Sequence, residues 1–120
     1  MDRTELLAPF ERLLETSCPP ATVRAIERGE DASKLWNEIE ASGFLDALVP
    51  ENRGGAGLTL ADIAPVLMAC GRFAVPLPVG DTIAARFLFS QLGEVAPSGP
   101  IGLADGHDGG AATGALPAPR

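Results

Sequence analysis

The chain has 120 residues, which is a common size for a single domain. Its 16 acidic side chains outnumber its 9 basic ones, giving a formal net charge of −7. This balance argues against nucleic acids and anionic membranes as partners, because both are recognised through basic patches. The hydrophobic fraction of 46% is that of a folded protein. Aromatic residues make up only 5% of the chain and tyrosine is absent, which leaves no stacking platform for single-stranded nucleic acid.

The N-terminal residues, the lengths of the apolar runs and the two cysteines favour a cytoplasmic protein. Asp2, Glu5 and Glu11 interrupt the first apolar residues, unlike the uncharged core of a signal peptide. No apolar run approaches the roughly 18 residues of a membrane span. Cys18 and Cys70 lie far apart in the sequence, without the spacing of a zinc or thioredoxin-like site. A disulfide between them is one alternative, but we expect two reduced structural cysteines.

Apolar residues recur every three or four positions through the first 95 residues, which predicts a series of helices. Pro19 and Pro20 end the first helix, and Pro20 is suited to the first turn of the second. Asp31 is the expected N-cap of the third helix, and Gly43 the residue that ends it. The predicted helices are residues 5–15, 21–28, 32–42, 60–73 and 82–92.

The segment between the third and fourth helices is a short apolar stretch followed by a glycine-rich turn at residues 50–57. Thr59 and Asp62 form a capping box at the start of the fourth helix. Pro65 lies inside this helix and predicts a bend, because proline removes one backbone hydrogen bond. Asp81 or Thr82 is the expected cap of the fifth helix.

The fourth and fifth helices are apolar on nearly every side. The only charged residues are Asp62 and Arg72 in the fourth helix and Arg86 in the fifth. Helices of this kind lie in the interior of a protein, yet about 95 structured residues scarcely suffice to cover both. Two explanations remain open at this point. The shorter helices wrap the two into a compact bundle, or the two dock on further protein.

The character of the chain changes at residues 97–120, where ten of 24 residues are glycine or proline. Such a segment buries too little apolar area to offset the entropy of ordering it, and we expect it to be mostly disordered. A short strand at residues 101–104 would have no partner. The sequence therefore predicts a helical domain at residues 1–96 and a tail, or the truncated start of another domain, at residues 97–120.

No catalytic or metal-binding motif stands out. Residues 55–60 open a helix but lack the third glycine of a dinucleotide-binding fingerprint, and no second strand with an acidic residue follows. Asp105, His107 and Asp108 have metal-ligand chemistry, but the tail offers no scaffold to hold a geometry, and we expect no metal. Three other carboxylates are interpreted as solvated groups on helix surfaces and turns: Glu38, Glu40 and Glu51.

A family resemblance lies in an ordered series of segments. These are LWNEIEASGFLDALVPE at residues 35–51, GGAGL at 54–58, the apolar stretch 60–67, and GRFAVPLP at 71–78. Together they resemble the N-terminal helical domain of acyl-CoA dehydrogenases, over roughly residues 5–95. The order and separation of the segments carry the resemblance, because no single segment is diagnostic.

The resemblance implies an all-α fold, a small bundle of about five helices, within a larger FAD-dependent enzyme. Members of the family remove an α-proton from an acyl-CoA thioester with a carboxylate and pass the β-hydride to the flavin. An electron-transfer flavoprotein then takes the electrons. The N-terminal helices form one wall of the acyl pocket and pack on a C-terminal bundle. Candidates for that wall, with core packing as the alternative role, are Thr82, Ala85 and Phe89.

The resemblance also leaves gaps. The catalytic base and most flavin contacts of the family lie in the middle and C-terminal domains, and this sequence reaches only the expected start of the β-domain near residues 100–105. We therefore expect the 120-residue chain by itself to be inactive. Arg53 replaces a common aromatic residue, and Met68 and Ala69 replace common acidic residues. These departures keep an alternative open: a non-catalytic helical interaction module, or a degenerate subunit that pairs with an intact flavoenzyme.

Overall fold

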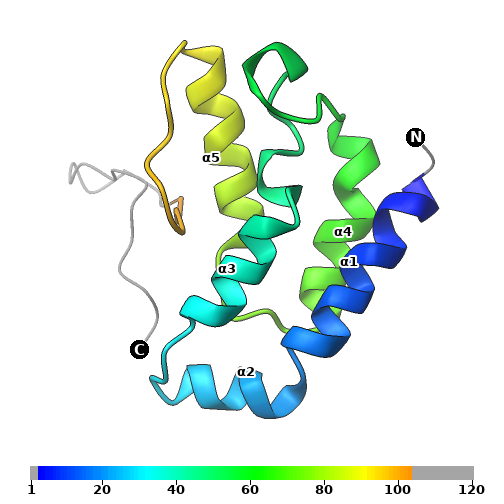
Figure 1. Ribbon diagram of the computed structural model, residues 1–120, viewed down its shortest axis with the longest axis vertical. Coiled ribbons are helices and arrows are strands. Elements are labelled where there is room, and N and C mark those ends of the chain that lie inside the picture. Colours follow the sequence, from blue (N-terminus) through cyan, green and yellow to red (C-terminus); the bar gives the residue numbers. More distant parts are fainter. Residues whose placement is uncertain (1–2, 104–120) are drawn as a thin grey trace.

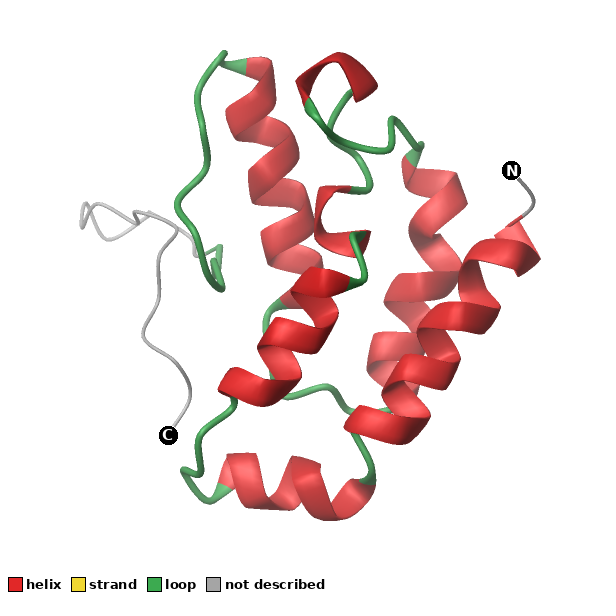
Figure 2. Ribbon diagram, in the orientation of Figure 1, coloured by secondary structure: helices red, strands yellow, loops and turns green. Residues whose placement is uncertain are grey.

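The computed structural model describes residues 3–103 and consists of helices. No strand occurs within these residues, which confirms the predicted all-α class (Figures 1 and 2). Two short 3-10 helices, η1 and η2, occupy the segment between the third and fourth α-helices. The elements are α1 Arg3–Ser17, α2 Pro20–Glu27, α3 Ser33–Ala41, η1 Phe44–Asp46, η2 Glu51–Arg53, α4 Leu60–Arg72 and α5 Val79–Gln91.

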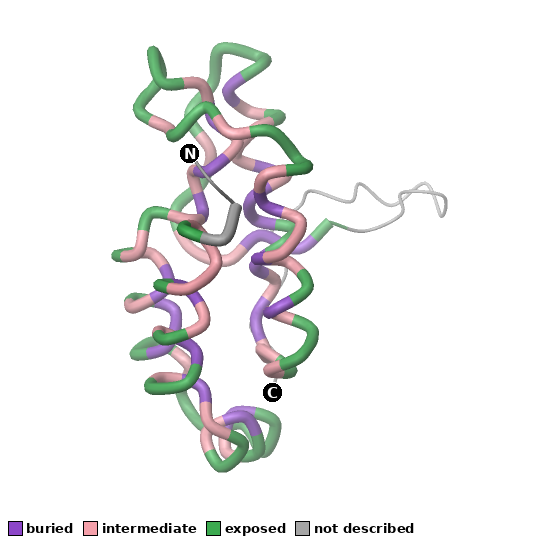
Figure 3. The backbone as a smooth tube through the Cα atoms, turned by 90° about the vertical axis from the view of Figure 1, so that its right-hand side faces the viewer, coloured by how far each residue is buried: buried purple, intermediate pink, exposed green. Residues whose placement is uncertain are grey.

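The four longer helices form two layers. In Figure 1, α1 and α3 lie in front of α4 and α5, and α2 crosses one end of the domain. The view turned by 90° separates the two layers, with α2 below them (Figure 3). Helix α1 packs on α4, and η1 packs on both α3 and α5. Each layer thus buries apolar side chains of the other layer, as in other domains built from two packed layers.

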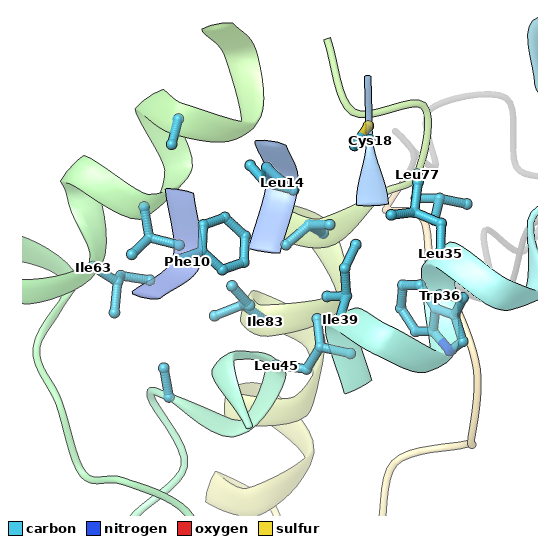
Figure 4. Packing of buried hydrophobic residues seen from close by; sticks show 14 of the residues in the cluster. Phe10, Leu14, Cys18, Leu35, Trp36, Ile39, Leu45, Ile63, Leu77 and Ile83 are labelled. Atoms are coloured by element: carbon cyan, nitrogen blue, oxygen red, sulfur yellow. The ribbon is translucent and has the colours of Figure 1, made fainter. Parts of the chain in front are cut away.

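The core lies between the layers (Figure 4). Phe10 of α1, Ile39 of α3, Ile63 of α4 and Ile83 of α5 are at most 1% exposed. The rings of Phe10 and Phe44 meet edge to face, with centroids 4.8 Å apart, a favoured aromatic geometry. All four layer-forming helices therefore contribute to one hydrophobic cluster.

Most of the predicted helix boundaries are confirmed to within a few residues. Pro20 is the first residue of α2, and Thr59 and Asp62 form the capping box of α4. Gly43, which follows the C-cap residue of α3, adopts a φ of +82°, a conformation that residues with side chains disfavour. The prediction for Asp31 is wrong, since Ala32 takes the N-cap position of α3. The Asp31 carboxylate still accepts hydrogen bonds from the Ser33 amide and hydroxyl, at 3.0 and 2.6 Å.

Helix α5 begins three residues earlier than predicted. Pro78 takes its N-cap position, so the prediction of Asp81 or Thr82 as the cap is wrong. Proline is readily accommodated before a helix, because it gives up no hydrogen bond there. Asp81 lies in the first turn, and the Thr82 hydroxyl lies 2.7 Å from the carbonyl oxygen of Pro78 one turn earlier. Pro65 lies within α4, and the bend expected there stays a prediction.

The first residues of the predicted tail, 97–103, lie against the helical domain, while the expectation that the tail is mostly disordered stays a prediction. Residues 94–103 run back along α5 (Figure 1), and Ile101 is only 2% exposed. Composition does not reveal this contact, because it depends on one apolar side chain and on hydrogen bonds between Thr82 and the backbone of Ile101. No strand forms at residues 101–103. Residue 104 and the remainder of the predicted tail lie outside the described residues, and the domain boundary at residue 96 stays a prediction.

Candidate functional site

Helices α4 and α5 share an outward, uncharged surface, which we call the α4–α5 face. On each helix its four residues recur at positions i, i+4, i+7 and i+8, the spacing of one helical face. The buried residues of α4 and α5, among them Val66 and Val79, point in other directions. The face consists of Leu60, Ala64, Leu67 and Met68 from α4 and of Gly80, Ala84, Phe87 and Leu88 from α5.

Large apolar side chains of this face are open to solvent. Leu60 is 64% exposed, Met68 66% and Leu88 52%. The two helices meet closely, because a Cβ atom added to Gly80 would lie 3.5 Å from the Cδ2 atom of Leu67. The two halves of the face therefore meet at Leu67 and Gly80. Exposed large apolar side chains gathered on one face in this way mark a contact with another protein surface or with an apolar ligand.

The three residues predicted to line an acyl pocket lie on the flank of α5 that borders the returning segment. Thr82 is fully buried and Ala85 is 2% exposed, while Phe89 is half-buried. The structure thus brings them to one side of the helix, as their spacing predicts. The chain itself covers Thr82, which bonds to the backbone of Ile101. Their contact with an acyl group stays a prediction.

A groove of about 320 Å³ opens near the C-terminal end of α5. Its walls include Asp46, Arg53, Arg86 and Glu94. Acyl chains require predominantly apolar walls, so these charges do not suit an acyl tail. None of the three predicted pocket residues lines this groove. This groove is therefore not the acyl pocket that the sequence analysis predicts on α5.

Arg86 has a structural role that the sequence analysis missed. Its side chain is 11% exposed, and its guanidinium group donates two hydrogen bonds to the Glu40 carboxylate, at 2.6 and 2.8 Å, and one to Asp46 at 3.2 Å. The hydrogen bond from Arg86 lowers the pKa of Glu40 below its ordinary value. Glu40 is thus an ion-pair partner as well as the partly solvated carboxylate that we expected. The available signal was that Arg86 is the only cation in an otherwise apolar helix.

The glycine-rich turn does not form a phosphate cradle. The amide of Gly55 donates to the Pro50 carbonyl at 3.1 Å, and that of Gly57 to the Val49 carbonyl at 2.9 Å. Cradles for nucleotide phosphates require such amides to be free. No buried side-chain nitrogen or oxygen in the described part lacks a hydrogen-bond partner. This turn therefore does not fit the phosphates of the FAD that the resemblance implies.

Both cysteines are free thiols. Burial raises the pKa of Cys70 to about 11 and also raises the pKa of Cys18. A thiol with a raised pKa is a poor nucleophile and a poor metal ligand at neutral pH. The two cysteines are therefore part of the packing in this domain.

No metal site is found among residues 3–103, where no group of three acidic, cysteine or histidine side chains gathers closely enough. Asp105, His107 and Asp108 lie outside the described residues. None of the helices within the described range is long and apolar enough to cross a membrane.

Comparison with known proteins identifies the family. The family described as "Acyl-CoA dehydrogenase, N-terminal domain" matches residues 2–94. The protein named acyl-CoA dehydrogenase IpdE2 of Mycolicibacterium smegmatis is 37% identical over 100 residues, which are 80% of this chain and 32% of that protein. IpdE2 of Mycobacterium tuberculosis is 38% identical over 94 residues, 74% of this chain and 29% of that protein.

The chain thus aligns with about a third of the length of these relatives. No solved structure matches it. The family match covers α1 to α5, and the five helices have the all-α architecture that the resemblance implied. The chain therefore belongs to the acyl-CoA dehydrogenase family and contains its N-terminal helical domain.

Proposed function

We propose that this chain is part of an FAD-dependent acyl-CoA dehydrogenase that introduces an α,β double bond into an acyl-CoA thioester, and that its helices form one wall of the acyl pocket. The observation that carries the proposal is the α4–α5 face. Leu60, Met68 and Leu88 are each more than half exposed, and burying such side chains in an interface is favourable by about 1.5–3 kcal/mol each. The relatives are about three times as long as the segment that aligns with this chain. We propose that the remaining domains of the enzyme pack on the α4–α5 face.

The acyl chain, in this proposal, runs beside the flank of α5 that carries Thr82, Ala85 and Phe89. Phe89 is half-buried and the other two are buried. Phe89 is thus the residue of the three that retains surface for a direct contact, and Thr82 and Ala85 support the wall from behind. An aromatic ring provides the large apolar surface that pockets for acyl chains use.

The catalytic carboxylate and the flavin site belong, in this proposal, to parts of the enzyme other than residues 3–103. The occupied amides of Gly55 and Gly57 support this division. We accordingly expect the described part to be inactive when it is isolated. An electron-transfer flavoprotein is the proposed electron acceptor. A cytoplasmic location is also proposed, and the free thiols of Cys18 and Cys70 are typical of a reducing compartment.

The full-length protein, purified from its own cells, tests this function directly. We expect bound flavin in its visible spectrum and acyl-CoA-dependent reduction of an artificial electron acceptor. Leu88→Lys places a charge on the α4–α5 face and should cause loss of flavin and activity, because a buried lysine opposes docking. Asn37→Lys adds the same charge at an exposed site on α3 and should leave both unchanged.

Other results would favour the alternatives. A colourless, monomeric full-length protein would indicate a helical interaction module rather than an enzyme. Flavin that belongs to a second, co-purifying chain would indicate a degenerate subunit paired with an intact one. Equal effects of Leu88→Lys and Asn37→Lys would contradict the assignment of the α4–α5 face.

The pocket wall has a separate test. Phe89→Ala removes the only half-exposed ring among the three candidates, and we expect a change in the relative kcat/KM values for short and long acyl-CoA substrates. An active variant with an unchanged substrate preference would show that Phe89 does not line the pocket. That result would leave the assignment of the reaction intact.

A further inference from the structure

A single buried hydroxyl joins α5 to the segment that follows it. The Oγ1 atom of Thr82 accepts a hydrogen bond from the Ile101 amide at 2.9 Å. It also lies 2.7 Å from the Pro78 carbonyl oxygen and 3.2 Å from the Ile101 carbonyl oxygen. A hydroxyl has one proton and two acceptor positions, so the proton goes to one of these carbonyls while the oxygen holds the Ile101 amide. Thr82 is 0% exposed, and its hydroxyl is therefore fully engaged within the chain.

A second contact lies beside the first. The amide of Leu103 donates to the Oδ2 atom of Asp81, at 3.2 Å. The side chain of Ile101 is 2% exposed, and Gly102 is buried as well. Two consecutive side chains of α5, Asp81 and Thr82, thus bind two amides at alternate positions of residues 101–103.

The segment between α5 and residues 101–103 is rich in glycine and proline, so its composition does not predict that residues 101–103 attach to α5. Between α5 and the anchored residues the chain passes through Gly93, Pro97, Gly99 and Pro100, and residues 92–95 and 97–98 are exposed. The segment therefore gains little from burial until it reaches Ile101. A buried amide left without a partner costs more than a hydrogen bond contributes, so the Thr82 oxygen decides whether Ile101 can remain buried.

We propose that Asp81 and Thr82 are positioning residues that anchor residues 101–103 on the first turns of α5 and so set where the chain leaves the helical domain. The anchor goes beyond the proposed enzymatic function and does not depend on it. Its consequence is that whatever follows residue 103 starts from a fixed point on α5 rather than from the end of a loose linker.

Hydrogen–deuterium exchange of the full-length protein, resolved to single amides, tests the anchor. Thr82→Val keeps the volume of the side chain and removes its oxygen, and we expect the Ile101 amide to exchange about 10-fold faster. Thr82→Ser restores an oxygen at the same position and should return the exchange of that amide towards the wild-type rate. Asp81→Ala should speed exchange of the Leu103 amide by about 3-fold and leave the Ile101 amide protected.

Ser90→Ala is the matched control. Ser90 is a second buried hydroxyl on α5, but its hydrogen bond goes to the Phe87 carbonyl of its own helix. Ser90→Ala should leave the exchange rates of the Ile101 and Leu103 amides unchanged. The anchor is refuted if Ile101 exchanges at the wild-type rate in Thr82→Val, if Thr82→Ser fails to restore protection, or if Ser90→Ala has the same effect. If Thr82→Val unfolds α5, the response of the Leu103 amide to Asp81→Ala decides the question.

Discussion

Arg86 of α5 and Glu40 of α3 form a two-point ion pair between the two layers of the domain. The guanidinium nitrogens donate to the two carboxylate oxygens at 2.6 and 2.8 Å, across 46 residues of sequence. The same guanidinium reaches Asp46 of η1 at 3.2 Å. Planar, parallel hydrogen bonds of this kind are among the strongest polar contacts and fix the relative orientation of the groups that they join. The pair therefore sets how α5 lies against α3 and η1.

Replacing Arg86 should destabilise the domain. Arg86→Met keeps the apolar stem but leaves two half-exposed carboxylates without their cation. We expect the free energy of unfolding to fall by about 2 kcal/mol, between the values for exposed and buried ion pairs. Urea denaturation of the protein measures the change. Glu40→Gln should cost less, since Arg86 then keeps Asp46.

The exposed pair of Arg28 and Glu30 is the control for this comparison. Its atoms lie 3.4 Å apart and both side chains are more than 60% exposed. Arg28→Met should therefore change the free energy of unfolding by less than about 0.5 kcal/mol. Similar effects of Arg28→Met and Arg86→Met would contradict a special role for the pair between the layers.

The ion pair also predicts an acid-sensitive stability. Arg86 lowers the pKa of Glu40 in the folded state, whereas an unfolded glutamate has a pKa of about 4.3. The unfolded state thus binds the proton more readily, and the stabilisation from Glu40 is complete above about pH 5. It is lost as the pH falls through the lower, folded-state pKa. Thermal unfolding from pH 7 to pH 3 should show a shallower decline for Glu40→Gln than for the wild type, and parallel declines would contradict this origin.

Gly55 is a position where a methyl group cannot fit. A Cβ atom there would lie 2.1 Å from the carbonyl oxygen of Val49 and 2.5 Å from its Cβ atom. Gly55→Ala must therefore displace backbone, and we expect a loss of about 1–3 kcal/mol in the free energy of unfolding.

Gly71 provides the opposite case. It lies in α4, and a Cβ atom there would meet nothing within 4 Å. Gly71→Ala should raise the free energy of unfolding by about 0.5 kcal/mol, because alanine loses less entropy in a helix. Chemical denaturation of both variants tests these two predictions. A destabilising Gly71→Ala or a neutral Gly55→Ala would contradict the packing described around these glycines.

Cys70 should resist alkylation in the folded protein. Its pKa of about 11 leaves roughly one thiolate per thousand molecules at pH 8, and the thiolate is the form that reacts. We expect iodoacetamide to modify it about 100-fold more slowly than an unperturbed thiol of pKa near 8.5. Mass spectrometry of the alkylated peptide gives the rate, and the same reaction in urea should be fast. Rapid labelling of the native protein would contradict the burial of this thiol.

The sequence predicted those structural features that depend on residues close together in the chain. The capping box of Thr59 and Asp62, the proline at the start of α2 and the left-handed Gly43 were all readable, because each depends on residues within one turn of the chain. Asp81 and Thr82 were misjudged as caps. Both have the chemistry of a cap, and only the position of Pro78 at the start of α5 shows that they lie inside the helix.

The sequence also identified the two helices that were too apolar for a small domain. Their pattern left open whether shorter helices cover them, because periodicity describes one helix at a time and contains no information about its neighbours. The tertiary structure shows that one side of α4 and α5 is buried against α1 and η1, while Met68 and Leu88 stay exposed.

By itself, then, the sequence determined the all-α class, the helix order and the family resemblance, since these follow from periodicity, caps and the order of local segments. The tertiary structure decided that Arg86 pairs with Glu40 and that Ile101 is held by Thr82. These pairs are 46 and 19 residues apart. Contacts over such separations depend on how complete helices pack, and no local rule of hydrogen bonding or periodicity selects one distant partner over another.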